Sequence, residues 1–452
     1  MKTIGIIGAG ISGLTLAYLL KKKFGNSLNI KIFEGNSFPG GCIQTVHDAG
    51  FLFELGPRSC RSAGNGRYTL RLIEELSLTE EIISADKSSR KKFIYRDEKL
   101  QALPAGIFGA LFSPLMKGVP KALLRELFIP KGSGSEETIE QFMVRRFGRY
   151  MTDTFIDPMT LGIYAGKIAE LSMKACFPLL HTYEQINGSI MKGVFSRKKC
   201  DVSSSEFVRK FCKEPIFSFR NGMQTLTDTL AKHLKNELFL KKTADNITFK
   251  KEKIIVSFKN HEPEECDSLF AACPGEHLAE LLKEDIPNFP SVETASVALA
   301  CVGYKKQVLP NKGFGHLIPS SEKNPVLGMV WDSSVFPQQN KRPDETRLSV
   351  MTGGSLFPGM IDMSEKEIEI LAIKAVKEQL NITEIPDSIT IYKRKNAIPQ
   401  YTIGHMDRIK KMEEHVKNLS PHFSFLGWNY YGVSVNDCIA QAYHLTEHQR
   451  GI

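Results

Sequence analysis

The fold is decided by residues 3–13, which read TIGIIGAGISG. The apolar run before Gly8 predicts a buried parallel strand, and the apolar residues from Leu14 to Lys23 predict a helix. Gly8 permits a tight turn, Gly10 lets the backbone approach a pyrophosphate, and Gly13 lets helix and strand pack closely. The N–H groups at the helix N-terminus would hold the pyrophosphate. Strand, glycine turn and helix in this order predict a dinucleotide-binding unit.

The residues after this unit favour FAD over NAD as the dinucleotide. A second strand over residues 29–33 ends at Glu34, whose carboxylate is placed to accept hydrogen bonds from a ribose and disfavours NADP. Gly40-Gly41 and the turn within Phe53–Ser59 would carry the rest of a long cofactor along the backbone. The expected cofactor-binding residues are Gly8, Ala9, Gly10, Ile11, Ser12, Gly13, Glu34, Gly41, Cys42, Gly56, Pro57, Arg58, Ser59, Val433, Ser434 and Val435.

The nucleotide domain is resumed twice later in the chain. Residues 253–258 alternate like a strand, and residues 266–274 read as a buried strand that ends at a turn. A last strand at 423–427 precedes residues 430–438 and an apolar helix. This closing unit places a helix N-terminus under a flavin ring, or else forms only a packing helix.

Length and composition indicate a soluble protein with more than one domain. The chain has 452 residues, 42% hydrophobic and 24% charged, which excludes a disordered or fibrous protein and suggests two or three domains. Its formal net charge is +9, and the basic excess concentrates in residues 87–131 and 192–213. These windows are either solvated faces or sites for an acidic partner. They lack interleaved aromatic residues, so we expect no nucleic-acid binding.

Cysteine usage and apolar runs indicate the cellular compartment in which the protein works. The nine cysteines are scattered without a CxxC pair, which argues against a disulfide framework or a metal site and favours a reducing compartment. Glycines interrupt the apolar N-terminus, so it reads as folded structure rather than a secretory signal. Residues 100–116 are too short and too rich in proline and glycine to span a membrane, although contact with a membrane surface stays open.

Five stretches then make a family recognisable. They are Phe53–Ser59, Gly162–Gly166, Gly313–Leu317, Ile398–Tyr401 with Gly404-His405, and Gly432–Cys438. Over essentially its whole length the chain resembles the oxygen-dependent protoporphyrinogen oxidases, within the amine-oxidase-like flavoproteins. The resemblance implies an α/β fold (α+β overall) with a Rossmann-like FAD-binding domain, a mixed-sheet substrate domain and a helical membrane-binding insertion.

The resemblance also implies domain limits. The FAD-binding domain would comprise residues 1–85, 214–290 and 395–452, and the substrate domain 86–102, 200–213 and 291–394, with the insertion at 103–199. The substrate-binding positions would be Lys92, Gly162, Leu317, Leu327 and Met351. Lys92 stands where the family has a propionate-binding arginine, and it offers a point charge instead of a bidentate fork. Asn221 before Gly222 and Phe38-Pro39 before Gly40 also depart from the family pattern.

The expected insertion suggests a function for basic residues of the window 87–131. Apolar contact with lipid would come from Ile107, Phe108, Leu111, Phe112, Leu115 and Met116. Attraction to acidic head groups would come from Lys117, Lys121 and Arg125. We therefore expect a cytoplasmic protein bound peripherally to a membrane, without a transmembrane span.

The implied activity is the six-electron oxidation of protoporphyrinogen IX by O₂, giving H₂O₂ in the penultimate step of haem biosynthesis. The flavin carries the chemistry, so no catalytic side chain is nominated, and His316 and His405 are expected to be structural. The expected partners also include a second copy of the chain, in a homodimer, and the next enzyme of the pathway, to which the product would be handed off. The alternatives are a coproporphyrinogen III oxidase forming coproporphyrin III, an FAD amine or polyamine oxidase, and a non-catalytic binding protein with the flavin fold.

Overall fold

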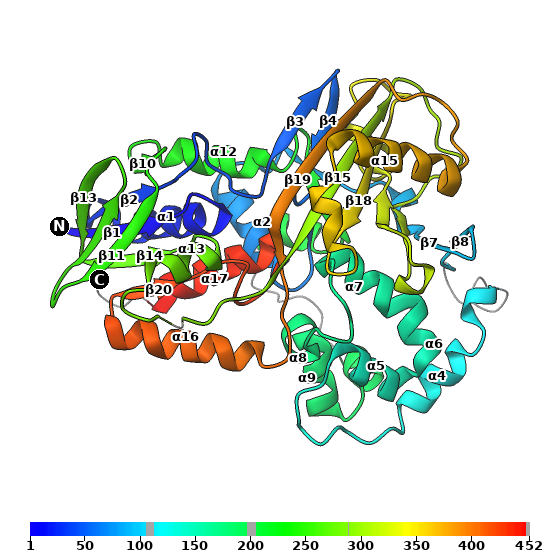
Figure 1. The fold of residues 1–452 in the computed structure, drawn as a ribbon, viewed down its shortest axis with the longest axis horizontal. Coiled ribbons are helices and arrows are strands. Elements are labelled where there is room, and N and C mark those ends of the chain that lie inside the picture. Colours follow the sequence, from blue (N-terminus) through cyan, green and yellow to red (C-terminus); the bar gives the residue numbers. More distant parts are fainter. Residues whose placement is uncertain (105–112, 197–204, 288, 449–452) are drawn as a thin grey trace.

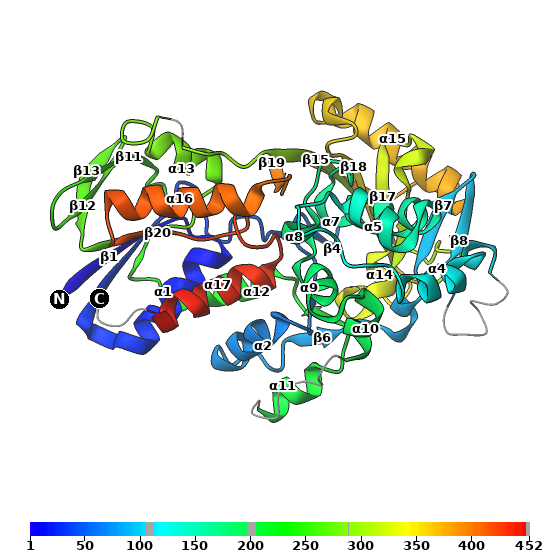
Figure 2. The same ribbon diagram turned by 90° about the horizontal axis from the view of Figure 1, so that it is seen from below.

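The computed structural model describes residues 1–452 except 105–112, 197–204, 288 and 449–452 (Figure 1). Two β-sheet bodies lie side by side, and a group of helices packs below the second sheet (Figures 1 and 2). The α/β fold with a mixed second sheet and a helical insertion is confirmed.

The nucleotide half is built on a five-stranded parallel sheet. In spatial order its strands are β10 (Leu238–Phe239), β2 (Leu28–Phe33), β1 (Lys2–Ile7), β14 (Ser268–Ala271) and β20 (Phe423–Phe425). Both faces are covered, which explains the continuous apolar runs of these strands. Ile4 and Ile6 pack on one side with helices α1 (Ile11–Phe24), α12 (Gln224–His233) and α17 (Val435–His448).

The opposite face of this sheet carries a second layer. Ile7 and Phe33 pack there with an antiparallel sheet formed by β11 (Ala244–Phe249), β12 (Ile254–Phe258) and β13 (His261–Cys266). Helices α13 (Gly275–Leu281) and α16 (His405–Leu419) complete the layer. The strands predicted at 29–33, 253–258, 266–274 and 423–427 all form, with slightly different ends.

The second half is a seven-stranded mixed sheet. Its order is β19 (Ser388–Pro399), β15 (Thr294–Tyr304), β18 (Thr346–Gly353), β17 (Val326–Val330), β16 (Gly315–Leu317), β7 (Phe93–Arg96) and β8 (Lys99–Ala102). Its pairs are antiparallel except β16 with β7. Helix α15 (Glu365–Leu380), which starts with a capping box at Ser364 and Glu367, covers one face.

Short elements connect the two halves. Strands β3 (Thr45–Asp48) and β4 (Phe51–Glu54) form a hairpin whose phenylalanines pack on β15. Strands β5 (Cys60–Arg61), β9 (Ile216–Phe219) and β6 (Ile82–Ser84) form a small sheet beside helix α2 (Gly66–Glu75). Helix α14 (Asp332–Val335) follows β17.

The insertion is helical. Its helices are α4 (Val119–Glu126), α5 (Ile139–Phe147), α6 (Arg149–Met151), α7 (Asp157–Tyr164), α8 (Met173–Cys176), α9 (Pro178–Asn187) and α10 (Ile190–Phe195). Helix α9 ends at Gly188, whose φ of 70° lies in the left-handed region that favours glycine. Across the described ranges, no helix is both long and apolar enough to cross a bilayer.

Two features differ from the expected domain limits. The limit between residues 394 and 395 falls inside β19, which runs unbroken from one half of the molecule to the other. Helix α11 (Glu206–Phe211), expected in the substrate domain, instead packs against α2, because Val208 belongs to the apolar cluster of the nucleotide half.

Candidate active site

A cavity of about 800 Å³ follows the carboxyl ends of the parallel strands. This is where ligands bind in open α/β sheets. Of the expected cofactor-binding residues, those that line it are Gly8, Gly10, Ile11, Ser12, Glu34, Gly41, Cys42, Pro57, Val433 and Val435. One cavity therefore gathers residues from five separate stretches of the chain.

The glycines of the first turn have the spacing that a dinucleotide needs. A Cβ on Gly13 would lie 2.0 Å from the carbonyl oxygen of Gly8, so this glycine permits the close contact of helix and turn. A Cβ on Gly10 would meet no atom within 4 Å, so the space beside it is open to a ligand. Gly41 has a φ of 62° and approaches the Cα of Gly10, which narrows the cavity where a pyrophosphate would cross. The space beside these glycines therefore fits a dinucleotide.

Glu34 lines one end of the cavity. Its side chain is buried, and its Oε2 accepts a hydrogen bond of 2.8 Å from the backbone N–H of Ala9. Its Oε1 accepts from the backbone and side-chain nitrogens of Asn36 at 2.8 and 2.7 Å. The carboxylate is thereby fixed beside the glycine turn, with lone pairs left for ribose hydroxyls. Ala9 contributes this backbone hydrogen bond and does not line the cavity.

The N-terminus of α17 closes the other end. Val433 and Val435 line the cavity, whereas Ser434 does not. The hydroxyl of Ser434 donates to Asp437 Oδ2 at 2.6 Å, and its backbone N–H donates to the same oxygen at 3.3 Å. Ser434 thus caps the helix, since its hydroxyl also accepts a hydrogen bond of 3.2 Å from the backbone N–H of Asp437. The Asp437 carboxylate in the first turn offsets part of the positive end of the helix dipole.

An apolar chamber adjoins the cavity. It consists of two neighbouring spaces of about 320 and 170 Å³, whose linings share Arg58, Gly162 and Met351. Gly56, Pro57 and Ser59 line the larger space, and Lys92 and Leu317 line the smaller one.

Helix α7 forms one wall of this chamber. A Cβ on Gly162 would lie 2.7 Å from Leu317 Cδ2, so the glycine lets α7 pack closely against Leu317. Leu327, expected in the site, is 1% exposed and packs behind the wall with Leu161 and Ala165. Leu327 therefore supports the chamber without lining the spaces found among the described residues.

Two cations line the smaller space. Arg58 Nη1 forms an ion pair of 3.0 Å with Asp332 Oδ1, and Asp332 Oδ2 accepts a hydrogen bond of 2.7 Å from Ser349. Lys92 is exposed and forms no ion pair with a described carboxylate. Its pKa is lowered, first because protein displaces water from the ammonium and then because Arg61 adds a like charge. Lys92 is thus the cation there that stays available to an anion.

A buried carboxyl lies where the two halves meet. Glu54 accepts hydrogen bonds from the backbone N–H of Met223 at 2.7 Å and from the hydroxyl of Thr45 at 2.9 Å. Burial raises its pKa to about 7, although these hydrogen bonds and Arg58 oppose the rise.

The two histidines of the motif stretches have structural partners. His316 Nε2 bonds Gln379 of α15 at 2.7 Å, and His405 Nε2 bonds the carbonyl of Tyr430 at 2.8 Å. Burial lowers the pKa of each to about 4. Both rings are neutral at pH 7 and engaged in the core.

Sequence reasoning missed the contribution of β19. Tyr392, Lys393, Arg394 and Lys395 line the nucleotide cavity, and Tyr392 and Arg394 also line the chamber. Trp428 lines both as well. The one available signal was the position of these basic residues just before the motif Ile398–Tyr401.

A dinucleotide cavity that opens onto an apolar chamber, on this fold, defines a flavin-dependent oxidoreductase. Comparison with known proteins agrees. Residues 11–444 match the family of flavin containing amine oxidoreductases. The protoporphyrinogen oxidases of Bos taurus and Macaca fascicularis are 33% and 32% identical over 97% of this chain and 96% of theirs. The chain belongs to the protoporphyrinogen oxidases of this flavoprotein family.

A solved structure supports the fold. It comes from Exiguobacterium sp. 255-15, is provisionally named a protoporphyrinogen oxidase, and superposes with a TM-score of 0.83 at 24% identity. The superposition covers 99% of this chain and 98% of that chain.

Proposed function

We propose that the protein oxidises protoporphyrinogen IX to protoporphyrin IX, with FAD as the cofactor and O₂ as the electron acceptor. The observation that carries this proposal is the apolar chamber that opens directly onto the nucleotide cavity and has Lys92 at its far end. A porphyrinogen is a large apolar ring with carboxylates on one side. Aliphatic walls and an available cation suit both of its parts.

The reaction removes six electrons and six protons in three equal rounds. A flavin held in the cavity would supply the chemistry of each round, which is acceptance of a hydride from a carbon of the macrocycle while the macrocycle releases one proton to water. O₂ then takes two electrons and two protons and leaves as H₂O₂. The protein's own residues bind and orient the ring, through Leu317 and Met351, and exclude water from it. No side-chain base is required.

FAD is the flavin that we propose on the basis of length. The cavity runs from Glu34 and Asn36 past the glycine turn to Trp428 and Val433. This extent suits a dinucleotide, and Glu34 is placed for an adenosine ribose. Chromatography of the flavin released by heat tests this assignment. A mononucleotide would contradict it.

The substrate assignment is tested by turnover of two porphyrinogens. Coproporphyrinogen carries four carboxylates and protoporphyrinogen carries two. Arg58 is already paired with Asp332, so of the two cations at the smaller space only Lys92 is left unpaired. We therefore expect a higher kcat/KM with protoporphyrinogen IX. Faster turnover of coproporphyrinogen III would assign the protein to the alternative activity.

A membrane surface is the partner that we propose for the insertion. Exposed apolar side chains gather on its helices and the turns beside them: Leu124, Phe128, Leu179, Ile186, Val194 and Phe195. Lys117, Lys121 and Arg125 are exposed on or next to α4. Apolar side chains beside basic ones suit an interface with acidic head groups.

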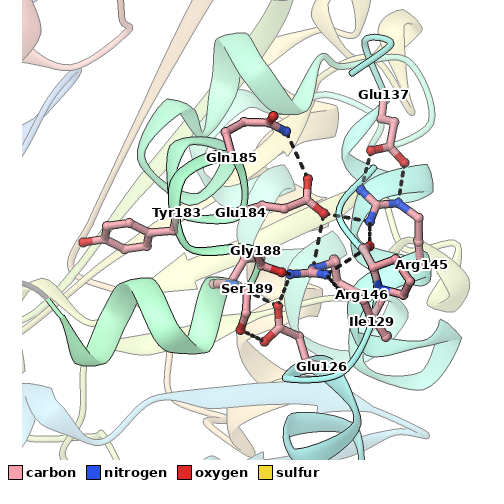
Figure 3. A network of polar contacts seen from close by, with 12 residues as sticks. Glu126, Ile129, Glu137, Arg145, Arg146, Tyr183, Glu184, Gln185, Gly188 and Ser189 are labelled. Atoms are coloured by element: carbon pink, nitrogen blue, oxygen red, sulfur yellow. Dashed lines mark hydrogen bonds and ion pairs between the residues drawn. The ribbon is translucent and has the colours of Figure 1, made fainter. Parts of the chain in front are cut away.

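A buried charge network holds these helices together (Figure 3). Arg146 of α5 pairs with Glu126 of α4 at 2.7 Å and donates to the carbonyl of Gly188 at 2.7 Å. Glu126 in turn accepts from Ser189 and from the backbone N–H of Ile190, at the N-terminus of α10. A rigid arrangement of α4, α9 and α10 limits the entropy lost when their apolar side chains meet a surface.

The membrane proposal corrects one expectation. Leu115 was expected to touch lipid, but it is only 4% exposed and therefore packs inside the protein. Ile107, Phe108, Leu111 and Phe112 lie outside the described residues.

Sedimentation with vesicles tests the membrane proposal. Replacing Phe128, Ile186 and Phe195 by serine should move the protein from acidic phospholipid vesicles to the supernatant. The matched control replaces Ile370, Ile373 and Ile385, which are also exposed but lie on or near α15. Equal sedimentation of both triple variants would contradict the proposal. Cytoplasmic location, a homodimer and hand-off of the product stay predictions.

A further inference from the structure

Arg394 lies at the junction between the nucleotide cavity and the apolar chamber. Residue 394 pairs with Val297 in the register of β19 and β15, and Val297 lines the chamber. The residues that line both spaces define the junction: Cys42, Pro57, Tyr392, Arg394, Trp428 and Val433. A flavin bound in the cavity would have its ring at this junction, because the ring is the part of the cofactor that has to face the substrate.

The contacts of Arg394 are all uncharged. Its guanidinium lies 5.9 Å from the centre of the Trp428 ring. Burial raises the pKa of the nearby Cys42 thiol, and the charge of Arg394 opposes that rise. A long contact of 3.5 Å joins its Nη1 to the hydroxyl of Tyr392. No ion pair joins Arg394 to a carboxylate within the described part of the chain. The cation is held in place and its charge is not neutralised.

The other positive groups near this junction are engaged. Arg58 is paired with Asp332, and the Asp437 carboxylate lies in the first turn of α17, where it offsets the positive end of the helix. On β19 itself, Lys393 donates to the carbonyl of Met363 at 2.6 Å, and Lys395 lies 3.6 Å from Asp362. Among the residues that line both spaces, Arg394 is the one cation, and no described carboxylate neutralises it.

A flavin bound at this junction would gain negative charge in the proposed reaction. A hydride would bring two electrons and one proton to the neutral ring, which would then be an anion unless it took a second proton. A cation held in a partly desolvated site stabilises such a charge more strongly than it would in water. Charge beside the ring is one of the means by which a protein tunes a flavin.

We infer that Arg394 faces the ring of the bound flavin, stabilises its reduced anionic form, and thereby raises the reduction potential of the enzyme. This inference rests on the proposed function, because it needs a flavin in the cavity. It adds a residue that acts through the cofactor and not through the carboxylates of the substrate.

The test is redox titration of the flavin-loaded protein. Arg394→Gln should weaken the preference for reduced over oxidised flavin about tenfold, which for a two-electron couple is a shift of about 30 mV to more negative potential. Arg394→Lys, which keeps the charge, should retain most of the wild-type potential. The control Arg209→Gln makes the same substitution at an exposed position on α11 and should change nothing.

The outcomes separate this inference from the proposed function. A wild-type protein that binds no flavin would overturn both. Flavin-loaded Arg394→Gln with the wild-type potential would overturn the inference alone. Weaker binding of oxidised and reduced flavin by the same factor would assign Arg394 to the pyrophosphate instead. A higher KM for the porphyrinogen at unchanged potential would assign it to the carboxylates of the substrate. Both of these results also contradict the inference.

Discussion

The nucleotide cavity and the substrate chamber are built in opposite ways. The cavity depends on backbone: its essential residues are glycines within residues 8–13 and 40–41, where the absence of a side chain makes room for a ligand. The chamber depends on side chains, and its walls come from α7, β7, β16 and β18. The difference teaches that short runs of consecutive residues make the glycine turns of the cavity, whereas the chamber exists only once distant strands and the insertion have packed together. Changes in the two regions should therefore fail in different ways.

The largest effect should come from Gly10→Val. An added side chain would meet open space, so the protein should fold, but the space it fills is the proposed path of the pyrophosphate. We expect a folded, colourless protein that holds about a tenth of a flavin per chain or less. Absorbance and circular dichroism together measure this outcome. Gly359→Val also adds a side chain in open space, away from the cavity, and is the control. A fully yellow Gly10→Val protein would remove the glycine turn from the cofactor site.

The next prediction is that damage to the chamber lowers turnover while the cavity keeps its flavin. Arg146→Ala leaves Glu126 and Glu184 buried without their shared partner, and breaking such a network costs about 3–5 kcal/mol. Because α7 of the same insertion walls the chamber, turnover should fall while the flavin content is kept. Chemical unfolding measures the loss of stability, and flavin absorbance measures the flavin content. Arg149→Ala breaks an exposed pair and should cost less than about 1 kcal/mol. Loss of flavin in Arg146→Ala would mean that the two regions do not fail separately.

A smaller effect is expected at the chamber cation. Lys92→Ala should raise the KM for the porphyrinogen about fivefold, because an exposed charge contributes about 1 kcal/mol at most to an ion pair. The affinity for flavin should not change. Steady-state kinetics with Lys91→Ala as the control measures this, since Lys91 is exposed but does not line the chamber. An unchanged KM would remove Lys92 from the substrate site.

The last effect is on stability alone, and it concerns the carboxyl between the two regions. The folded protein holds the pKa of Glu54 at about 7, above its ordinary value of 4.5. Between these values the unfolded chain releases a proton that the folded protein keeps, so this group makes stability fall as the pH rises from about 4.5 to 7. Unfolding midpoints measured across this range should fall less steeply in Glu54→Gln. Identical slopes in both proteins would contradict the raised pKa.

The sequence predicts the cavity far better than the chamber. Gly8–Gly13 and Glu34 lie close together in the chain, so their spacing carries the geometry. The chamber residues Gly162, Leu317 and Met351 came only from a family resemblance, because Gly162 is more than a hundred residues away from the other two in the sequence. Arg394 could not be predicted, since the run Lys393–Lys395 reads as solvated surface until β19 pairs with β15.

The central claim is that the cavity and the chamber work together as one oxidase. Porphyrin fluorescence, followed after purified protein is mixed with protoporphyrinogen IX under air and under nitrogen, tests it most directly. The account predicts rapid appearance of protoporphyrin under air, with three H₂O₂ formed for each porphyrin, and little beyond the first reduction of the flavin under nitrogen. Fluorescence that rises under air no faster than without the protein would contradict the account.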